Sequence, residues 1–446
     1  MVDREMPPPS PADATGGPAS PTAEPVLARR AAVAVGLGTL IEVYDFAVYA
    51  FVAVTIAPIF FPSDVPGVSI LLTFAVFGTA YVVRPLGGWF FGWLGDSRGR
   101  KPALVASVLL MGAACALFGL LPTYEQVGIL APVLLVVVRL VQGFSVGGEV
   151  GGGATYVGEF APDGKRGWFT ALLPAGATMG SAVAAAVVGL MSVLTTDEQM
   201  VSWGWRIPFL VAIPLALLCL RVRSRLEDTP GFVAAEKKSG TVRSPLLTVL
   251  RERPGSVVRV LALTAAMSGA GYISTSYFNT YLISTLGFGR TEVLWTSAVS
   301  IFLGALTYPF SGKLADRLGR KPTLTLAFVV YLVIAWPGFA LLGATSSLVV
   351  VALVFIAFIA VSGTVQAAAF PVFTELFPLR IRYTGVSLGY NVGVIIAGGM
   401  APYIAAQLVV STGNAMSPAY WVMFTAVVGL LTVRTLRETA HTSLPT

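Results

Sequence analysis

Charged side chains stand inside long apolar stretches in the first half of the chain, where burying a charge is costly. These residues are Glu42, Asp45, Arg84, Arg139 and Glu149. A charge placed in hydrocarbon costs about 2.5–3.5 kcal/mol on insertion scales, so residues of this kind usually serve a function. The second half has no charge well inside an apolar stretch. We therefore expect proton coupling to reside in the first half.

Glu42 and Asp45 are spaced to act together, because residues three apart share one face of a helix. A carboxyl group in a dry site holds a proton more readily than one in water, and a neighbouring carboxylate strengthens this tendency. The single histidine, His441, follows the last apolar stretch, so an acid must carry any proton through the helices. The alternative is a static ion pair with Arg84 that only holds helices together.

Arg84 offers a guanidinium fork whose geometry matches a carboxylate. Its partner is either an anionic group of a substrate or one of the acids Glu42 and Asp45. If protonation of the acid frees Arg84, proton binding and substrate binding become linked. The alternatives are a fixed ion pair, or snorkelling to the membrane surface from a position about 16 Å inside the predicted helix end.

Arg139 and Glu149 fall in one predicted helix, about 15 Å apart along its axis, so they cannot pair with each other. We predict roles in proton coupling for both, with structural bonds to neighbouring helices as the alternative. Uncharged polar side chains are assigned to the substrate site together with Arg84, although each also suits a bond between helices. They are Tyr44, Tyr49, Gln142, Tyr277 and Asn279, with Gln366 and Asn391 as further candidates.

The elements that position these residues follow from the composition. Of 446 residues, 55% are hydrophobic and 11% are charged, against about 25% charged in an average soluble domain. This balance excludes a soluble enzyme and a disordered chain. The apolar stretches are continuous, as in transmembrane helices of about 20 residues, and lack the alternation of a β-barrel. We predict an all-α integral membrane protein with twelve transmembrane helices, near residues 31–60, 66–95, 103–121, 127–158, 167–193, 205–221, 257–285, 292–314, 322–343, 347–373, 384–411 and 417–435.

No cofactor or metal site is expected. Cys115 and Cys219 both lie in apolar stretches, which favours small apolar fillers over a disulfide. The glycine-rich stretch 147–153 lacks the Gly-Lys-Ser/Thr ending of a phosphate-binding loop, so the sequence does not support driving by ATP.

Polar segments divide the chain into domains. Residues 1–28 are predicted to be a disordered tail without the apolar core of a signal peptide. The polar loop 222–256 separates a six-helix bundle at 29–221 from a second at 257–437, and 438–446 is a short tail.

The distribution of positive charge predicts orientation. Most of the 29 Lys and Arg fall on segments that face inward if the N-terminus is inside. We therefore predict a multi-pass protein of the cell (inner or plasma) membrane with both tails and the central loop cytoplasmic. The excess of Lys and Arg then faces the cytoplasm and the anionic inner leaflet of the lipid bilayer. We see no basic groove of the kind that binds nucleic acid. The expected partners are a small-molecule substrate and protons, with no obligate protein partner evident.

Two segments recur in the second half. Residues 92–102 match 312–322, which aligns Asp96 and Arg100 with Asp316 and Arg320. In the same way Glu159 and Arg166 align with Glu375 and Arg382. The copies follow the second and fourth helices of each half. An even number of helices per half makes the repeat parallel, so the two six-helix bundles are related by a pseudo-two-fold axis, with a site expected between them.

The repeated loops at 92–102 and 312–322 resemble the signature loop of the major facilitator superfamily, and residues 139–143 resemble its fourth-helix motif. Further motifs resemble the metabolite:proton symporter family within it. They are Glu42-Val-Tyr44-Asp45-Phe46, Arg84-Pro85-Leu-Gly-Gly, Gly147-Gly148-Glu149, Trp203-Gly-Trp205-Arg206-Ile-Pro208 and Leu226-Glu227-Asp-Thr-Pro230-Gly-Phe232. The resemblance implies a secondary active importer, driven by the proton gradient and not an enzyme.

The repeated charges have a gating interpretation, largely through this resemblance. Ion pairs and helix-end contacts among them would close the inner side in one state. The alternative is that Arg and Lys only keep the loops inside. The predicted gate residues are Asp96, Arg100, Glu159, Arg166, Asp316, Arg320, Glu375 and Arg382.

Two departures from the family pattern bear on the substrate. Val43 stands where the family often has an aromatic residue, and the segment after Leu436 lacks the long coiled coil of osmosensing members. Together with Arg84, the missing coiled coil favours an organic acid such as 2-oxoglutarate, citrate or shikimate. The alternative is a zwitterionic osmolyte, proline or glycine betaine. A proton-driven exporter is less favoured, because 174–180 does not match an antiporter motif, and a ligand sensor without turnover is less favoured still.

Overall fold

The computed structural model describes residues 23–65, 67–98, 100–147, 149–223, 245–378, 381–440, 442 and 444–445. Side chains are described at all of these except 23–28, 30–31, 92–93, 95–98, 100–104, 222–223 and 245. Most of the predicted N-terminal tail and the loop 224–244 therefore lie outside the described residues, as does His441.

The first half is helical throughout its described elements. Its helices are α1 (Ala23–Phe60), α2 (Val68–Arg98), α3 (Arg100–Gly119), α4 (Tyr124–Val127), α5 (Leu130–Val146), α6 (Glu149–Phe160), α7 (Arg166–Thr170), α8 (Leu172–Leu194), α9 (Asp197–Ser202) and α10 (Ile207–Arg223). α1 begins ahead of the predicted start at residue 31, since Ala, Leu and Arg between 23 and 30 favour a helix.

The second half repeats this all-helical architecture. Its helices are α12 (Pro245–Glu252), α13 (Pro254–Tyr272), α14 (Phe278–Thr280), α15 (Arg290–Ala305), α16 (Tyr308–Leu318), α17 (Arg320–Ala344), α18 (Leu348–Glu375), α19 (Arg382–Gly393), α20 (Ala401–Thr412) and α21 (Ser417–Thr435). π-helical turns at Ile273–Tyr277, Tyr281–Thr285 and Val394–Gly399 join several of them. Turns of this kind often occur at functional sites.

The predicted number of membrane crossings agrees with the helices. Within the described ranges, 11 helices are long and apolar enough to cross a membrane. A shorter apolar helix, Val105–Gly119, lies at the third predicted position. Each of the twelve predicted stretches thus corresponds to helical structure.

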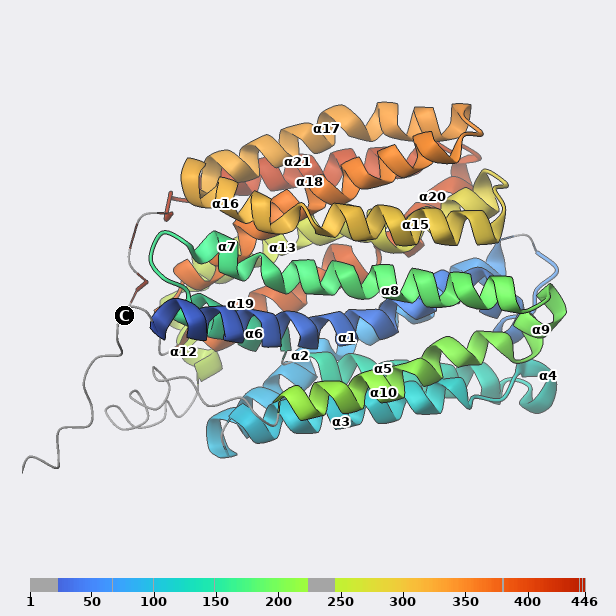
Figure 1. Ribbon diagram of the computed structural model, residues 1–446, viewed down its shortest axis with the longest axis horizontal. Coiled ribbons are helices and arrows are strands. Elements are labelled where there is room, and N and C mark those ends of the chain that lie inside the picture. The colour runs from blue at the N-terminus through green and yellow to red at the C-terminus, as the bar shows by residue number, and fades with distance from the viewer. Residues whose placement is uncertain are drawn as a thin grey trace, which may run out of the picture.

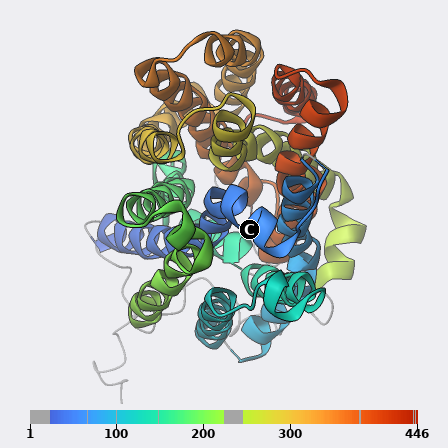
Figure 2. The same cartoon turned by 90° about the vertical axis from the view of Figure 1, so that its right-hand side faces the viewer.

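The helices run along the long axis of the molecule, and the two halves lie beside each other (Figure 1). The end-on view separates first-half helices, in blue and green, from second-half helices, in yellow to red (Figure 2). α8 and α15 pack together along the boundary. One end carries the loops after α2, α6, α16 and α18, and we call it the signature end; α4 and α9 lie at the opposite end.

Glycines allow α2 and α5 to pack backbone to backbone. A Cβ at Gly143 would overlap the carbonyl oxygen of Ala80, and one at Gly147 would overlap that of Arg84. α5 and α6 together cover the predicted helix 127–158 and make up one candidate membrane span, Leu130–Phe160. The close approach allows Arg84 of α2 and Arg139 of α5 to lie against the same ring, Phe46 of α1.

Candidate functional site

The charged residues predicted to carry chemistry are all withdrawn from the surface. Their exposed fractions are 6% for Glu42, 1% for Asp45, 4% for Arg84, 0% for Arg139 and 7% for Glu149. Arg84 therefore does not snorkel to the membrane surface.

Arg139 and Asp45 form one charged centre inside the first half. The Arg139 guanidinium lies 3.7 Å from the centre of the Tyr49 ring and donates a hydrogen bond to Gln142 Oε1 at 3.0 Å. Asp45 interacts with it electrostatically. The Cys115 thiol also interacts with the Asp45 carboxylate, but in the described part of the chain neither Asp45 oxygen has a partner in hydrogen-bond geometry, and Arg139 Nε and Nη2 donate no hydrogen bond. Buried charges with unused hydrogen-bonding capacity are costly, so this centre is suited to take up a proton or water.

Arg84 forms a second charged centre among aromatic rings. Its guanidinium carbon lies 4.3 Å from the Tyr81 ring centre and 4.9 Å from that of Phe46. Glu42 acts on it electrostatically, as do the phenol groups of Tyr272 and Tyr390 from the second half. Since Arg139 lies 5.5 Å from the same Phe46 ring, one aromatic side chain contacts both arginines.

The aromatic surface around Arg84 continues across the boundary between the halves. The Tyr81 and Tyr272 ring centres are 5.5 Å apart, and Phe74 and Tyr277 are 6.2 Å apart. We call Phe46, Tyr81, Tyr272 and Tyr390 the aromatic box. Sequence reasoning did not select these four residues. Tyr81 had a usable signal, because it lies three residues before Arg84 on the same helix face.

The predicted polar lining makes mostly local bonds. Tyr44 donates to the Pro208 carbonyl at 2.8 Å, and Tyr49 donates to that of Thr73 at 2.7 Å. Asn279 accepts from Ser297 at 2.6 Å, while its Nδ2 has no partner in the described structure. Tyr277 contacts Phe74, as given above.

The two further amide candidates, Gln366 and Asn391, make hydrogen bonds of different kinds. Gln366 donates to Ser362 at 3.0 Å within α18. Asn391 crosses the boundary and donates to the Gly147 carbonyl at 2.9 Å. Asn391 therefore joins the two halves at the end of α5.

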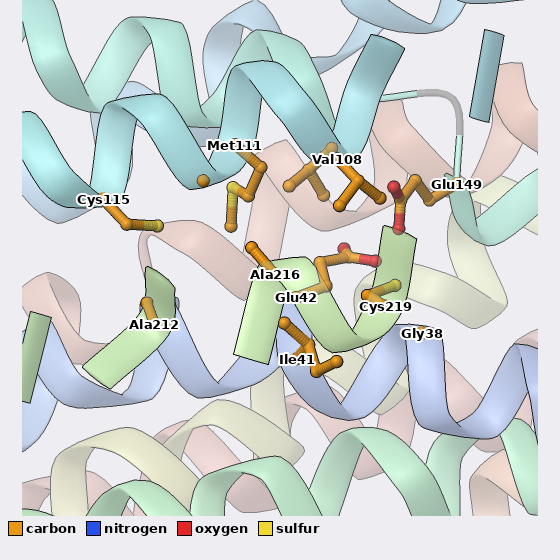
Figure 3. Close-up of a pocket in the computed structure, with 12 residues that line it drawn as sticks. Gly38, Ile41, Glu42, Val108, Met111, Cys115, Glu149, Ala212, Ala216 and Cys219 are labelled. Carbon is orange, nitrogen blue, oxygen red and sulfur yellow. The ribbon is translucent and has the colours of Figure 1, made fainter. Parts of the chain in front are cut away.

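Glu42 and Glu149 meet at a small cavity inside the first half. The cavity has a volume of about 20 Å³, and Cys115 and Cys219 also line it. Figure 3 shows the two carboxylates directed into the space between α1, α3 and α10. Ser107 donates a hydrogen bond to Glu149 Oε1 at 2.9 Å. A space of this size holds about one water molecule.

Six of the predicted gate residues come together at the signature end. Arg382 of the second half pairs with Glu159 of the first half at 3.3 Å. Reciprocally, Arg166 of the first half pairs with Glu375 of the second at 3.6 Å. Each repeated arginine thus pairs with the repeated glutamate of the other half, which the sequence repeat alone did not predict.

The remaining gate contacts centre on Asp316. It accepts backbone N–H bonds from Gly167 at 2.8 Å and Trp168 at 2.9 Å, at the start of α7. It also pairs with Arg320 at 2.8 Å. The side chains of Asp96 and Arg100, the corresponding residues of the first repeat, lie outside the described residues.

The halves also meet at the opposite end. Thr291 donates to Ser192 at 3.0 Å, and Arg290 lies 3.9 Å from Asp197. Contacts at both ends leave the two arginine centres between them, away from either surface.

The Major Facilitator Superfamily model matches residues 35–402. The glycine betaine/proline/ectoine/pipecolic acid transporter OusA of Dickeya dadantii is 36% identical over 428 residues, covering 93% of this chain and 84% of the relative. The proline/betaine transporter of Escherichia coli is also 36% identical, covering 93% and 85%. The shikimate transporter of Escherichia coli is 36% identical over 419 residues, covering 92% and 95%. Among solved structures, the proton:xylose symporter XylE superposes with a TM-score of 0.74 at 17% identity, covering 94% of this chain and 98% of that one, which supports the fold alone.

Proposed function

Because this chain belongs to the major facilitator superfamily and, within it, to the metabolite:proton symporters, we propose that it couples proton influx to the uptake of a zwitterionic osmolyte such as proline or glycine betaine. It is a multi-pass membrane transporter, not an enzyme. We assign the signature end to the cytoplasmic side, as the Lys and Arg distribution predicts.

The observation that carries the substrate proposal is Arg84 inside the aromatic box. A guanidinium fork binds a carboxylate, and aromatic rings bind a substituted ammonium through cation–π attraction. Tyr81 already lies 4.3 Å from Arg84, with Tyr272 beside it across the boundary. A zwitterion needs both kinds of partner within a few ångströms, and this site supplies both.

An organic dianion fits this arrangement less well. It would need a second free cation near Arg84, whereas Arg139 lies against Phe46 and Tyr49 and interacts with Asp45. The substrates after which the relatives are named also favour the zwitterion alternative over the organic acids that the sequence analysis preferred. Shikimate, a monoanion, remains the second candidate, since one relative carries that name.

Coupling follows from the acids that face the two arginines. In the deprotonated state Glu42 competes with a substrate carboxylate for Arg84, and protonation of Glu42 releases that competition. The cavity beside Glu42 provides space for a water molecule on the side shared with Glu149. A proton crossing 100 mV and one pH unit releases about 3.7 kcal/mol, enough for roughly 500-fold accumulation of a zwitterion.

The test is uptake into proteoliposomes under an inward proton gradient. Proline, glycine betaine, shikimate, 2-oxoglutarate and citrate are each supplied with and without an uncoupler. We expect proline or betaine to accumulate and the accumulation to collapse with the uncoupler. Accumulation of shikimate or a dianion alone would overturn the zwitterion proposal. Accumulation that persists with the uncoupler would overturn proton coupling.

A further inference from the structure

The segment that follows α21 contacts the charges that join the two halves at the signature end. We infer that Glu438, Thr439, Thr442 and Pro445 form a strap that holds this end closed and so biases the transport cycle. The inference rests on the proposed function in one respect: it assumes that the two halves separate here during transport. Its test requires no substrate, so it can fail independently of the substrate proposal.

The strap is anchored to the second half by Glu438. Its carboxylate accepts the backbone N–H of Arg320 at 2.9 Å and of Lys321 at 3.0 Å, at the first turn of α17. Lys321 in turn donates to the Leu436 carbonyl at 3.1 Å, just after α21. An acid is favoured at a helix N-terminus, because the free N–H groups and the helix dipole both stabilise negative charge. The anchor therefore joins the start of α17 to the end of α21.

The electrostatics of the anchor agree with this geometry. Burial on its own would raise the pKa of Glu438, but hydrogen bonds from the N–H groups of Arg320, Ala440, Lys321 and Thr439 outweigh it and hold the pKa below its usual value. Glu438 is thus ionised when it caps the helix at neutral pH.

From this anchor the strap extends to the two ion pairs that cross the boundary, Arg166–Glu375 and Arg382–Glu159. The Thr439 hydroxyl donates to Glu375 Oε2 at 2.6 Å, while Arg166 and Arg320 both approach Oε1 of the same carboxylate. The Thr442 carbonyl accepts a hydrogen bond at 2.8 Å from Arg166, which belongs to the first half.

The second pair is reached by Pro445. Its carbonyl accepts from Arg382 Nη2 at 2.7 Å, and Nη1 of the same guanidinium pairs with Glu159 of the first half. The strap therefore touches a residue of each charge pair that spans the boundary.

The strap carbonyls accept hydrogen bonds from the guanidinium groups of both charge pairs. A guanidinium has five N–H donors, and in this arrangement the Arg166 and Arg382 side chains are 3% and 2% exposed, so protein groups must satisfy most of these donors. Arg166 Nε already has no partner within the described residues. When the halves separate here, Arg166 must leave Glu375 and Thr442 together. Opening is consequently harder with the strap than without it.

The experiment measures opening directly by electron paramagnetic resonance. Spin labels are placed on Lys165→Cys and Arg317→Cys, two exposed positions in opposite halves. The native Cys115 and Cys219 are buried and leave the labelling specific. A chain ending at Ala440 is compared with the full chain in lipid nanodiscs. We expect the ratio of open to closed populations to rise about tenfold, the effect of losing the Arg166–Thr442 hydrogen bond, which crosses the boundary.

If the shortened chain fails to fold, a point substitution tests the same inference. Thr439→Val removes only the hydroxyl that fixes the strap to Glu375 of the second half. The looser strap should hold Arg166 of the first half less firmly through the Thr442 carbonyl, so the open fraction should rise in the same direction. Thr435→Val is the matched control, because that hydroxyl bonds to the Thr432 carbonyl within α21. The inference is wrong if a folded shortened chain, or Thr439→Val, keeps the distance distribution of the full chain, or if Thr435→Val shifts it equally.

Discussion

Replacing Arg84 by lysine tests the carboxylate half of the substrate site while keeping its positive charge. Lysine is a point charge and cannot hold a carboxylate with two parallel hydrogen bonds. It also loses the planar contact with Tyr81 at 4.3 Å and Phe46 at 4.9 Å. One hydrogen bond to a charged group contributes about 1.5–3 kcal/mol.

A loss of about 2 kcal/mol corresponds to a roughly 30-fold rise in the half-saturation concentration. The assay is initial-rate uptake of glycine betaine, or of proline if betaine is not taken up, in proteoliposomes with matched protein content. Arg317→Lys, at an exposed position of α16, is the control and should leave uptake unchanged.

A second readout separates recognition of the two substrate charges. Choline carries the trimethylammonium group of betaine without its carboxylate, so its inhibition constant should change little in Arg84→Lys. The reasoning is refuted if betaine keeps a half-saturation concentration within threefold of the unmodified protein. It is also refuted if choline and betaine weaken equally, since the loss would then be a general distortion of the site.

Other predictions follow from the acids and from the signature end. Asp45→Asn should abolish accumulation against a gradient yet retain counterflow exchange; continued accumulation would show that Asp45 is not the essential proton carrier. Glu159→Arg and Arg382→Glu should each open the signature end in the spin-label assay, and the double variant should restore closure; a double variant no better than the single ones would contradict the pairing. The Glu438 pKa is lowered on folding, so its contribution to stability is present above its unfolded pKa of about 4.3 and is lost as pH falls through the lower folded value. The Tm difference between the unmodified protein and Glu438→Gln should therefore shrink in this acidic range, and a constant difference from pH 7 to pH 3 would exclude the mechanism.

The helices and the repeat could be predicted because they depend on local or periodic signals. Continuous apolar stretches predicted twelve helices, and the aligned pairs Glu159/Glu375 and Arg166/Arg382 indicated the residues that form ion pairs at the signature end. The exchange of partners between the halves was not predicted, because a sequence repeat aligns equivalent residues without indicating which of them face each other. That pairing depends on the pseudo-two-fold arrangement of the bundles.

The aromatic box and the cavity could not be predicted from the sequence for a related reason. Glu42 interacts electrostatically with Arg84 and also lines a cavity with Glu149. Neither contact can be predicted from the spacing of residues along one helix. The approach of α5 to the Arg84 carbonyl, which leaves no room for a Cβ at Gly147, likewise depends on how two helices pack. Contacts between helices decided these features, whereas the sequence analysis considered each helix by itself.

The position of α1 suggests how one helix could link the two charged centres. Glu42, Asp45 and Phe46 lie within one and a half turns of this helix. Glu42 interacts electrostatically with Arg84, and Asp45 does so with Arg139, while the Phe46 ring contacts both arginines. We propose that a small rotation of α1 changes both electrostatic interactions together, because Phe46 cannot leave one guanidinium without altering its contact with the other. Phe46→Leu keeps an apolar side chain but removes the shared ring. It should uncouple substrate exchange from proton movement while exchange itself persists. If Phe46→Leu instead accumulates substrate normally, the two centres act independently and α1 does not link them.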